Sequence, residues 1–350
     1  MNQESQILAV DLFCGVGGLT HGLSRAGIQV RLGVDLDPAC RFPLEANNAT
    51  KFVEADVAQL ESSDIVLAFE GAEFTLLAGC APCQPFSSYS HSARRNRPHE
   101  DWELLSSFGS LVLSVRPTLV TMENVPPLRE RQIFKDFVEA LLDAGYFVDF
   151  KVLNGSHIGV PQRRRRLVLV ASLLGPINLP KVSYKTVTVR DVISELPVIE
   201  AGAANPTDPL HVSASLSELN KERMRHSEPG GTWRDWPEEI VATCHKRKSG
   251  STYPSVYGRM EWDQPAPTMT TQCYGFGNGR FGHPEQNRAI SLREAAMLQS
   301  FPEHYKFVPK GAAIVFSTLG RLIGNAVPVL LGEFIGKVLI EHVEASGLTG

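Results

Sequence analysis

The chain has 350 residues, of which 43% are hydrophobic and 21% charged, as in an ordinary globular protein that can bury its own core. No apolar run is long enough for a transmembrane helix, and residues 1–6 lack the basic and apolar segments of a signal peptide. We therefore expect a cytoplasmic protein with no membrane partner, and the six cysteines are too sparse for a disulfide framework.

The net charge of −4 argues mildly against a nucleic-acid partner, but the charge is unevenly distributed. Residues 151–290 contain 18 Lys and Arg against 13 Asp and Glu, whereas the remainder of the chain is acidic. An acidic body with a local basic segment suits a protein that binds DNA through one face. A solvated basic surface without a partner gives the same count, so both interpretations remain open.

The first 180 residues alternate short apolar runs with helical patterns. The apolar runs predict buried strands at residues 7–13, 30–34, 74–78, 118–122, 146–153 and 166–171. The helical patterns between them lie at residues 19–26, 102–115 and 129–144. This alternation predicts an α/β fold with a mostly parallel sheet that binds its ligand beyond the carboxyl ends of the strands.

Residues 181–290 are rich in Gly, Pro, Ser and Thr, and they show no sustained helical spacing except a weak one near residues 216–224. Helical character returns at residues 291–299, and an apolar run follows at 327–335. We predict a catalytic domain at 1–180, a smaller irregular domain at 181–317, and a C-terminal segment at 318–350 that returns to the first domain.

A glycine-containing loop, Asp11 to Gly18, lies between the first strand and the first helix. Glycines there let the backbone turn tightly and approach a ligand closely. Asp35 ends the next strand, where a carboxylate can bind ribose hydroxyls, and Asp56 could accept from an adenine amino group. A nucleoside ligand is favoured over a plain tight turn, although only two of the three glycines of a dinucleotide fingerprint can be fitted.

Cys83 follows a predicted strand on a loop stiffened by Pro82 and Pro85. A loop thiolate can act as a nucleophile, whereas most free cysteines are inert and packed. Cys80 and Cys83 have CxxC spacing, but nothing completes a tetrahedral zinc site, so we expect no metal.

Two further groups follow or open strands. Glu123 ends an apolar run and could be either a solvated loop acid or a buried, hydrogen-bonding one. In residues 162–166, alternation along a strand places Arg164 and Arg166 on one face. Adjacent guanidinium groups repel one another unless an anion meets them, which favours a phosphate-rich partner.

Six blocks resemble, in order, those of the DNA cytosine-C5 methyltransferases across nearly the whole chain. They are the glycine loop at 11–18, Pro82-Cys83-Gln84, Glu123-Asn124-Val125, Gln162-x-Arg164-x-Arg166, residues 293–302 and Gly324-Asn325-Ala326-Val327-Pro328. Any one block could arise by chance, but six in order leave little room for it.

The resemblance implies a Rossmann-like fold that binds S-adenosylmethionine and methylates C5 of a flipped-out cytosine in a specific double-stranded DNA sequence. It implies that Cys83 bonds to C6, that Glu123 and Arg166 hold the ring, and that Arg164 grips a phosphate or supports the loop. The cofactor-binding residues are then expected to be Phe13, Gly15, Gly18, Asp35, Leu36, Asp56, Val57, Leu104 and Asn325.

Cations alternate with aromatic side chains at residues 245–262, a pattern that suits phosphate contacts, although a surface loop without contacts looks the same. The expected DNA-binding residues are Gln84, Ser87, Lys246, Arg247, Lys248 and Arg259. The compact size and the lack of regulatory domains favour a bacterial restriction-modification enzyme, a monomer that protects DNA from a companion endonuclease.

Three other protein classes are alternatives. A transfer-RNA cytosine-C5 methyltransferase would usually lack a sizeable recognition region and would carry a Cys-Phe-Thr signature that is absent here. A non-catalytic DNA-binding relative would not require Cys83, Glu123 and Arg166. A nicotinamide-dependent oxidoreductase is disfavoured by the incomplete dinucleotide fingerprint. The recognised DNA sequence cannot be read from these residues.

Overall fold

The computed structural model describes residues 7–82, 100–247, 250 and 252–347, and the chain packs into two compact units. Unit 1 comprises Met1–Ile158, Arg165–Ser183 and Val327–Gly350, and unit 2 comprises Gly159–Arg164 and Tyr184–Ala326. The chain therefore leaves unit 2 later than the predicted boundary at 317/318. The reason is helix α9 (Phe316–Asn325), which packs against α8 (Leu292–Leu298) within unit 2.

Unit 1 contains a seven-stranded sheet in the order β3-β2-β1-β4-β5-β7-β6. Its strands are β1 (Ile7–Leu12), β2 (Gln29–Asp35), β3 (Lys51–Glu54), β4 (Phe74–Gly79), β5 (Leu119–Asn124), β6 (Phe147–Asn154) and β7 (Arg165–Ser172). β1 to β5 pair in parallel, and β7 runs antiparallel to both of its neighbours. The predicted α/β class and mostly parallel sheet are confirmed.

The inner strands are apolar because both faces of the sheet are covered. β1 and β5 are buried along their whole length, whereas the edge strand β6 is only partly buried. Fully covered parallel strands read as continuous apolar runs rather than as alternating ones. These strands could therefore be predicted from continuous apolar runs, although the runs show neither helical nor alternating periodicity.

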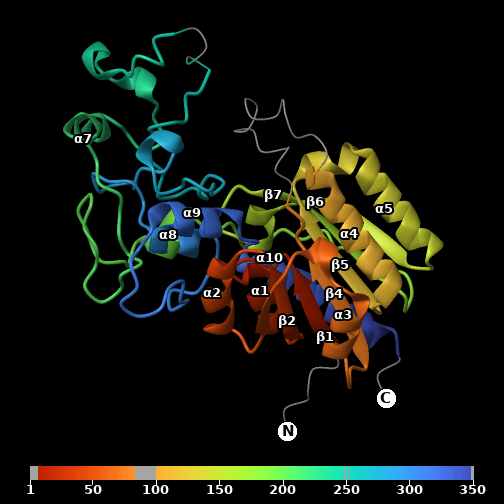
Figure 1. The fold of residues 1–350 in the computed structure, drawn as a ribbon. Coiled ribbons are helices and arrows are strands. Elements are labelled where there is room, and N and C mark those ends of the chain that lie inside the picture. The colour runs from red at the N-terminus through yellow and green to blue at the C-terminus, as the bar shows by residue number, and fades with distance from the viewer. Residues whose placement is uncertain (1–6, 83–99, 248–249, 251, 348–350) are drawn as a thin grey trace. The chain divides into compact units, whose positions relative to one another are not determined.

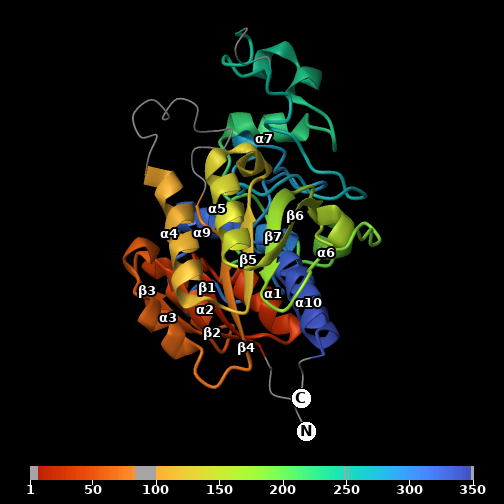
Figure 2. The ribbon, with the colours of Figure 1, turned by 90° about the vertical axis from the view of Figure 1, so that its right-hand side faces the viewer.

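Helices cover the two faces of the sheet. The helices of unit 1 are α1 (Gly18–Ala26), α2 (Arg41–Glu45), α3 (Ser62–Ala68), α4 (Glu100–Val115), α5 (Gln132–Asp143) and α10 (Val329–Ala345). α4 contacts both α3 and α5, and Figure 1 shows α4 beside α5. α1 lies against α10, as Figure 2 shows. The predicted helix at 129–144 is split, because Arg131 has extended backbone between a 3-10 turn (Pro126–Glu130) and α5.

The crossing of α1 and α10 is unusually close. A Cβ at Gly22 would lie 2.3 Å from the carbonyl oxygen of Val329, so only glycine fits. By length and composition alone, Phe316–Ala345 could span a membrane, but it is divided into α9 and α10, and 72% of its most apolar window is buried. The apolar run at 327–335 is thus core sequence of unit 1.

Unit 2 has little regular structure, as its composition predicts. Its helices are α6 (Val189–Ile193), α7 (Glu218–Arg225), α8 and α9, joined by 3-10 turns at Trp233–Asp235, Glu238–Ile240 and Phe276–Asn278. Its strand pairing consists of isolated bridges such as Ala204 with Val212. A small core of Trp233, Trp236, Ile240, Phe276 and Met224 packs beneath these turns.

Candidate active site

The loop after β1 is shaped to approach a ligand. Phe13, Gly15 and Gly17 all have positive φ, at 60°, 53° and 84°, and α1 begins directly afterwards at Gly18. A non-glycine residue such as Phe13 is rarely held in this conformation, and such strain concentrates at ligand-binding sites. A Cβ built on Gly15 would meet nothing within 4 Å, so this side of the turn is open.

Asp35 fixes the loop from the end of β2. Its Oδ2 accepts a hydrogen bond from the Gly15 backbone N–H at 2.8 Å, and its Oδ1 accepts from the Asp37 N–H at 2.9 Å. The neighbouring Leu36 is 66% exposed, which is unusual for a large apolar side chain. The predicted partnership of the glycine loop with Asp35 is therefore present, with an apolar surface beside it.

The remaining predicted nucleoside residues of unit 1 lie on neighbouring elements. Asp56 caps a 3-10 turn (Val57–Gln59) by accepting from the Ala58 N–H at 2.9 Å, and Val57 is buried. α4, which carries the partly buried Leu104, packs against this turn. Asn325 is exposed at the end of α9 in unit 2, so its role stays a prediction.

Asp11 is a buried carboxyl group for which we predicted no separate role. Thr20 donates a hydrogen bond to its Oδ2 at 2.6 Å, while its Oδ1 has no hydrogen-bond partner in the described part of the chain. Burial raises the pKa of Asp11 to about 7, and Asp35 adds to the rise. The sequence does contain a signal for this role, namely a carboxylate inside the apolar run at 7–13. Burying an acid costs free energy unless it is paired or hydrogen-bonded, so its presence there indicates a specific role.

Glu123 and Arg166 meet at the ends of neighbouring strands. Glu123, at the end of β5, is 3% exposed, and the Nε of Arg166 lies 2.6 Å from its Oε1. The β5–β7 register explains the pairing: Glu123 faces Val168, and Arg166 lies two residues away on the same face of β7. The choice between a solvated and a buried acid is thereby settled in favour of the buried one.

Arg164 lies on a different part of the fold from Arg166. It is 4% exposed in unit 2, where its Nη1 donates to the Met269 carbonyl at 3.1 Å and to the Gly324 carbonyl at 3.3 Å. Gln162 is also buried and donates to the Leu298 carbonyl at 3.1 Å. These contacts agree with the expectation that Arg164 supports the loop, and a catalytic role for it alongside Cys83, Glu123 and Arg166 stays a prediction.

The cysteines in the described part of the chain differ in reactivity. Burial raises the pKa of the Cys14 thiol well above its ordinary value and that of Cys273 to about 12, so both stay neutral. Cys80 donates to Oε2 of Glu123 at 2.8 Å. The predicted nucleophile Cys83, together with Gln84, Ser87 and Lys248, lies outside the described residues. No cluster of metal ligands occurs within the described ranges.

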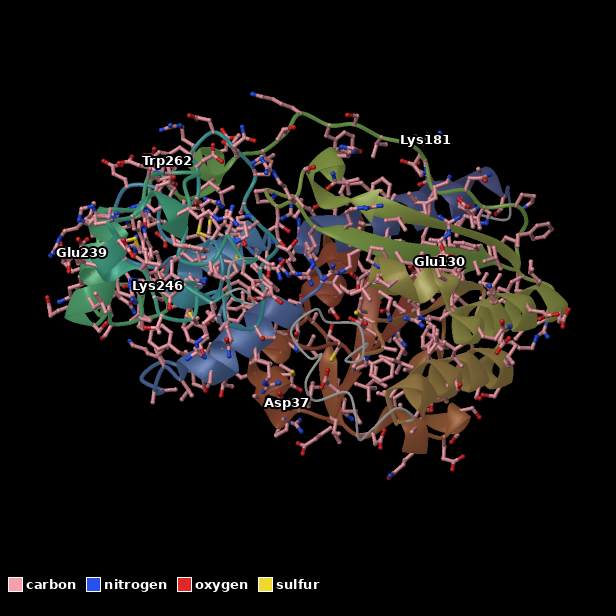
Figure 3. The ribbon with its side chains drawn as sticks, turned by 90° about the horizontal axis from the view of Figure 1, so that it is seen from above. Asp37, Glu130, Lys181, Glu239, Lys246 and Trp262 are labelled. Atoms are coloured by element: carbon pink, nitrogen blue, oxygen red, sulfur yellow. The ribbon has the colours of Figure 1, made fainter. Side chains whose placement is uncertain are left out.

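The predicted DNA-binding cations of unit 2 divide into two groups. Lys246 and Arg247 are exposed, and Figure 3 shows Lys246 in the same part of unit 2 as Glu239. Arg259 is 5% exposed, and it donates to the carbonyls of Ser227 at 2.7 Å, Met224 at 2.9 Å and His283 at 2.9 Å. These contacts indicate a structural role within its own unit, and its assignment to DNA stays a prediction.

Comparison with known proteins gives a consistent result. The profile of the C-5 cytosine-specific DNA methylases matches residues 7–341. The chain is 46% identical over 344 residues to the type II methylase M.HgiDII of Herpetosiphon aurantiacus, covering 96% of this chain and 95% of that protein. It is 30% identical to the type II methyltransferase M1.HphI of Haemophilus parahaemolyticus, covering 95% of this chain and 86% of the relative.

A solved structure shares the fold. A putative prophage DNA modification methyltransferase from E. coli superposes with a TM-score of 0.73 at 23% identity, over 97% of this chain and 99% of that chain. The seven-stranded sheet of unit 1 therefore belongs to a fold that this solved structure shares.

Proposed function

Because the chain belongs to the C-5 cytosine-specific DNA methylases, and is a DNA (cytosine-5)-methyltransferase that uses S-adenosylmethionine, we propose that it modifies a flipped-out cytosine through a covalent bond to Cys83. The observation that carries this proposal is the buried Glu123, paired with Arg166 at the ends of β5 and β7. β4, whose loop leads to Cys83, is the strand directly beside β5.

The residues at the β1 and β2 ends fit the nucleoside part of S-adenosylmethionine. The open side of Gly15 admits a ligand close to the backbone, and the carboxylate of Asp35 beside it suits ribose hydroxyls. The exposed Leu36 offers an apolar surface to a base, and Asp56 offers a carboxylate to an exocyclic amine. When bound there, S-adenosylmethionine would supply the methyl group by cleavage of its S–CH3 bond and would leave as S-adenosylhomocysteine.

The first chemical step follows from the electronic structure of cytosine. C5 lies in an aromatic ring and is a poor nucleophile, so attack of the Cys83 thiolate on C6 is needed to break the aromaticity. The new S–C6 bond pushes electron density towards C5 and towards N3 and O2. Glu123 shares a proton with N3 and accepts a hydrogen bond from the amino group, while Arg166 donates to O2, and these hydrogen bonds stabilise the negative charge that develops on the ring.

The covalent adduct is then resolved without any oxidant or reductant. After C5 has received its methyl group, a base removes the C5 proton, and the electron pair of that C–H bond re-forms the C5–C6 double bond. The S–C6 bond breaks, and Cys83 leaves as a thiolate. A stacked duplex hides C5 and C6, so the target cytosine must leave the helix, and unstacking it costs about a few kcal/mol.

The biological setting is proposed from the relatives. Two similar proteins are named as type II enzymes. We infer that this chain also methylates one short double-stranded sequence, acts as a monomer in the cytoplasm, and protects that sequence from a companion restriction endonuclease.

Bisulfite sequencing of plasmid DNA from cells that express the protein tests the proposal. The wild-type protein should leave 5-methylcytosine at one sequence, and Cys83→Ser should lower methylation by about 10³-fold or more, because the nucleophile is lost. Cys244→Ser, at an exposed cysteine, is the matched control and should leave methylation unchanged. Normal methylation by Cys83→Ser would refute the covalent route. If bisulfite sequencing found 5-methylcytosine in transfer RNA but not in DNA, the proposed substrate would be refuted.

A further inference from the structure

The carboxylate of Glu123 is held at both oxygens, but by contacts of different kinds. Arg166 Nε lies 2.6 Å from Oε1, yet its N–H does not point at that oxygen, so the contact is an ion pair rather than a directed hydrogen bond. The thiol of Cys80 makes a directed hydrogen bond to Oε2 at 2.8 Å. Within the described residues, this thiol is the directed donor to the carboxylate.

The sheet register brings these two groups together. Gly79 pairs with Met122 across β4 and β5, so the next residues, Cys80 and Glu123, are side by side at the strand ends. Neighbouring residues of paired parallel strands point to the same face. The backbone is also fixed there, because the Cys80 N–H donates to the Leu12 carbonyl at 3.3 Å and the Asn124 side chain donates to the Ala81 carbonyl at 3.0 Å.

A second contact matters because the terminal torsion of a glutamate is soft. Rotation about this bond has broad, roughly two-fold minima, so an ion pair at one oxygen leaves the plane of the carboxylate free to turn. A donor on the other oxygen fixes that plane. Glu123 is 3% exposed, so water is not available to take over this function.

We infer that Cys80 is a positioning residue for methyl transfer, which orients the Glu123 carboxylate towards the edge of the target cytosine. The inference rests on the proposed role of Glu123. Cys80 forms no bond to the substrate, and its contribution is the fixed orientation of an acid that must meet N3 and the amino group together.

Three substitutions distinguish a role of Cys80 as a hydrogen-bond donor from a role as a side chain that only fills space. Cys80→Ala removes the donor, Cys80→Val removes it while keeping the volume, and Cys80→Ser keeps a hydroxyl donor. The exposed Cys244→Ala is the control for thiol loss. Each purified protein is assayed for transfer of tritiated methyl groups from S-adenosylmethionine to unmethylated plasmid DNA, with thermal unfolding measured in parallel.

We expect Cys80→Ala and Cys80→Val to lower kcat by about 10- to 150-fold, the loss that accompanies removal of one hydrogen bond to a charged group. KM for DNA and for S-adenosylmethionine should stay within about twofold, because ground-state binding is not affected. Cys80→Ser should recover kcat to within about threefold of the wild type. A purely structural role would lower the unfolding midpoint and would not produce this split between kcat and KM.

A normal kcat for both Cys80→Ala and Cys80→Val overturns the inference, as does a Cys80→Ser protein as slow as Cys80→Ala. Glu123→Gln is assayed alongside to keep the two proposals apart. If Glu123→Gln is slow while Cys80→Ala is normal, only the positioning role fails. If Glu123→Gln turns over normally, the proposed role of Glu123 itself fails.

Discussion

The two units satisfy their backbone polar groups in different ways. In unit 1 the inner strands pair through long ladders, and an apolar core that includes Leu77, Val120 and Leu169 fills the space against the helices. In unit 2 the described residues form only isolated bridges and short helices, so many carbonyl groups have no ladder partner. Buried carbonyl groups must still be paired, and unit 2 pairs many of them with arginine side chains.

Arg259 and Arg288 show this use of cationic side chains. Arg259 binds the carbonyls of two separate segments, residues 224–227 and 283–286. Arg288, which is fully buried, binds the Ala289 carbonyl at 3.1 Å together with the carboxylate of Glu294. A guanidinium group has five donors in a planar fork, so one side chain can tie several loops. A loop-rich unit can therefore keep a defined shape without a large apolar core.

The largest expected effect comes from breaking such a tie. Glu294 is fully buried and accepts from both terminal nitrogens of Arg288 at 2.7 Å. Glu294→Ala leaves the guanidinium buried without its counter-charge, which should cost about 3–5 kcal/mol of unfolding free energy. Urea unfolding followed by tryptophan fluorescence measures this, since Trp233, Trp236 and Trp262 all lie in unit 2.

The exposed pair of Arg190 with Asp263 provides the control. Asp263→Ala removes an ion pair of similar length, 2.7 Å, but water solvates the remaining charge. The loss should be below about 1 kcal/mol. Equal losses for Glu294→Ala and Asp263→Ala would show that burial of the ion pair does not stabilise unit 2.

Acid should affect the two units in opposite directions. Burial raises the pKa of Asp11 in unit 1 from 3.8 to about 7 and lowers that of His283 in unit 2 from 6.5 to about 4. Between pH 4 and 7 folded unit 1 holds a proton that the unfolded chain has lost, so unit 1 gains stability as the pH falls. Between pH 6.5 and 4 the histidine is protonated in the unfolded chain but stays neutral in the folded unit, so unit 2 loses stability as the pH falls.

Hydrogen exchange followed by mass spectrometry at pH 5 and pH 7.5, corrected for the intrinsic exchange rate, resolves the two units. Each change should be on the order of 2 kcal/mol. Asp11→Asn should flatten the response of unit 1, and His283→Gln should flatten that of unit 2. A response of the same sign in both units would contradict these assignments.

Much of the secondary structure of unit 1 could be predicted because short runs of consecutive residues determine it. The apolar runs predicted the strands, but alternation along residues 163–166 wrongly placed Arg164 on the same strand face as Arg166, because β7 begins only at Arg165 and Arg164 folds into unit 2. The contact of Cys80 with Glu123 could not be predicted, because it depends on the register of β4 against β5. Register is a tertiary property that the spacing of residues along one chain does not contain.

Unit 2 was harder to predict for a related reason. A count of cations cannot tell a surface arginine from one that binds buried carbonyls, so the basic excess at 151–290 overstated the exposed charge. Arg164, Arg259 and Arg288 all contribute to that excess, and all are buried. The folding of Gly159–Arg164 into unit 2 was equally hidden, because its hydrogen bonds reach residues more than a hundred positions away.

Substitution of the exposed cations of unit 2 should have the smallest effect on stability. It also tests most sharply whether buried and exposed cations have different functions. Lys246→Ala and Arg247→Ala should each change the unfolding free energy by less than about 0.5 kcal/mol, because neither side chain is buried. If each contacts a phosphate, the slope of log affinity against log salt should become shallower by about 1 per substitution. Fluorescence anisotropy with a labelled duplex between about 50 and 200 mM salt measures this slope.

Arg259→Ala should give the reverse pattern. It should destabilise unit 2 and leave the salt slope unchanged under conditions where the protein remains folded, because its donors bind carbonyl groups and not phosphates. A salt slope lowered by Arg259→Ala but not by Lys246→Ala would mean that burial fails to separate structural from DNA-binding cations in this unit. The basic excess of the sequence would then belong to the DNA interface after all.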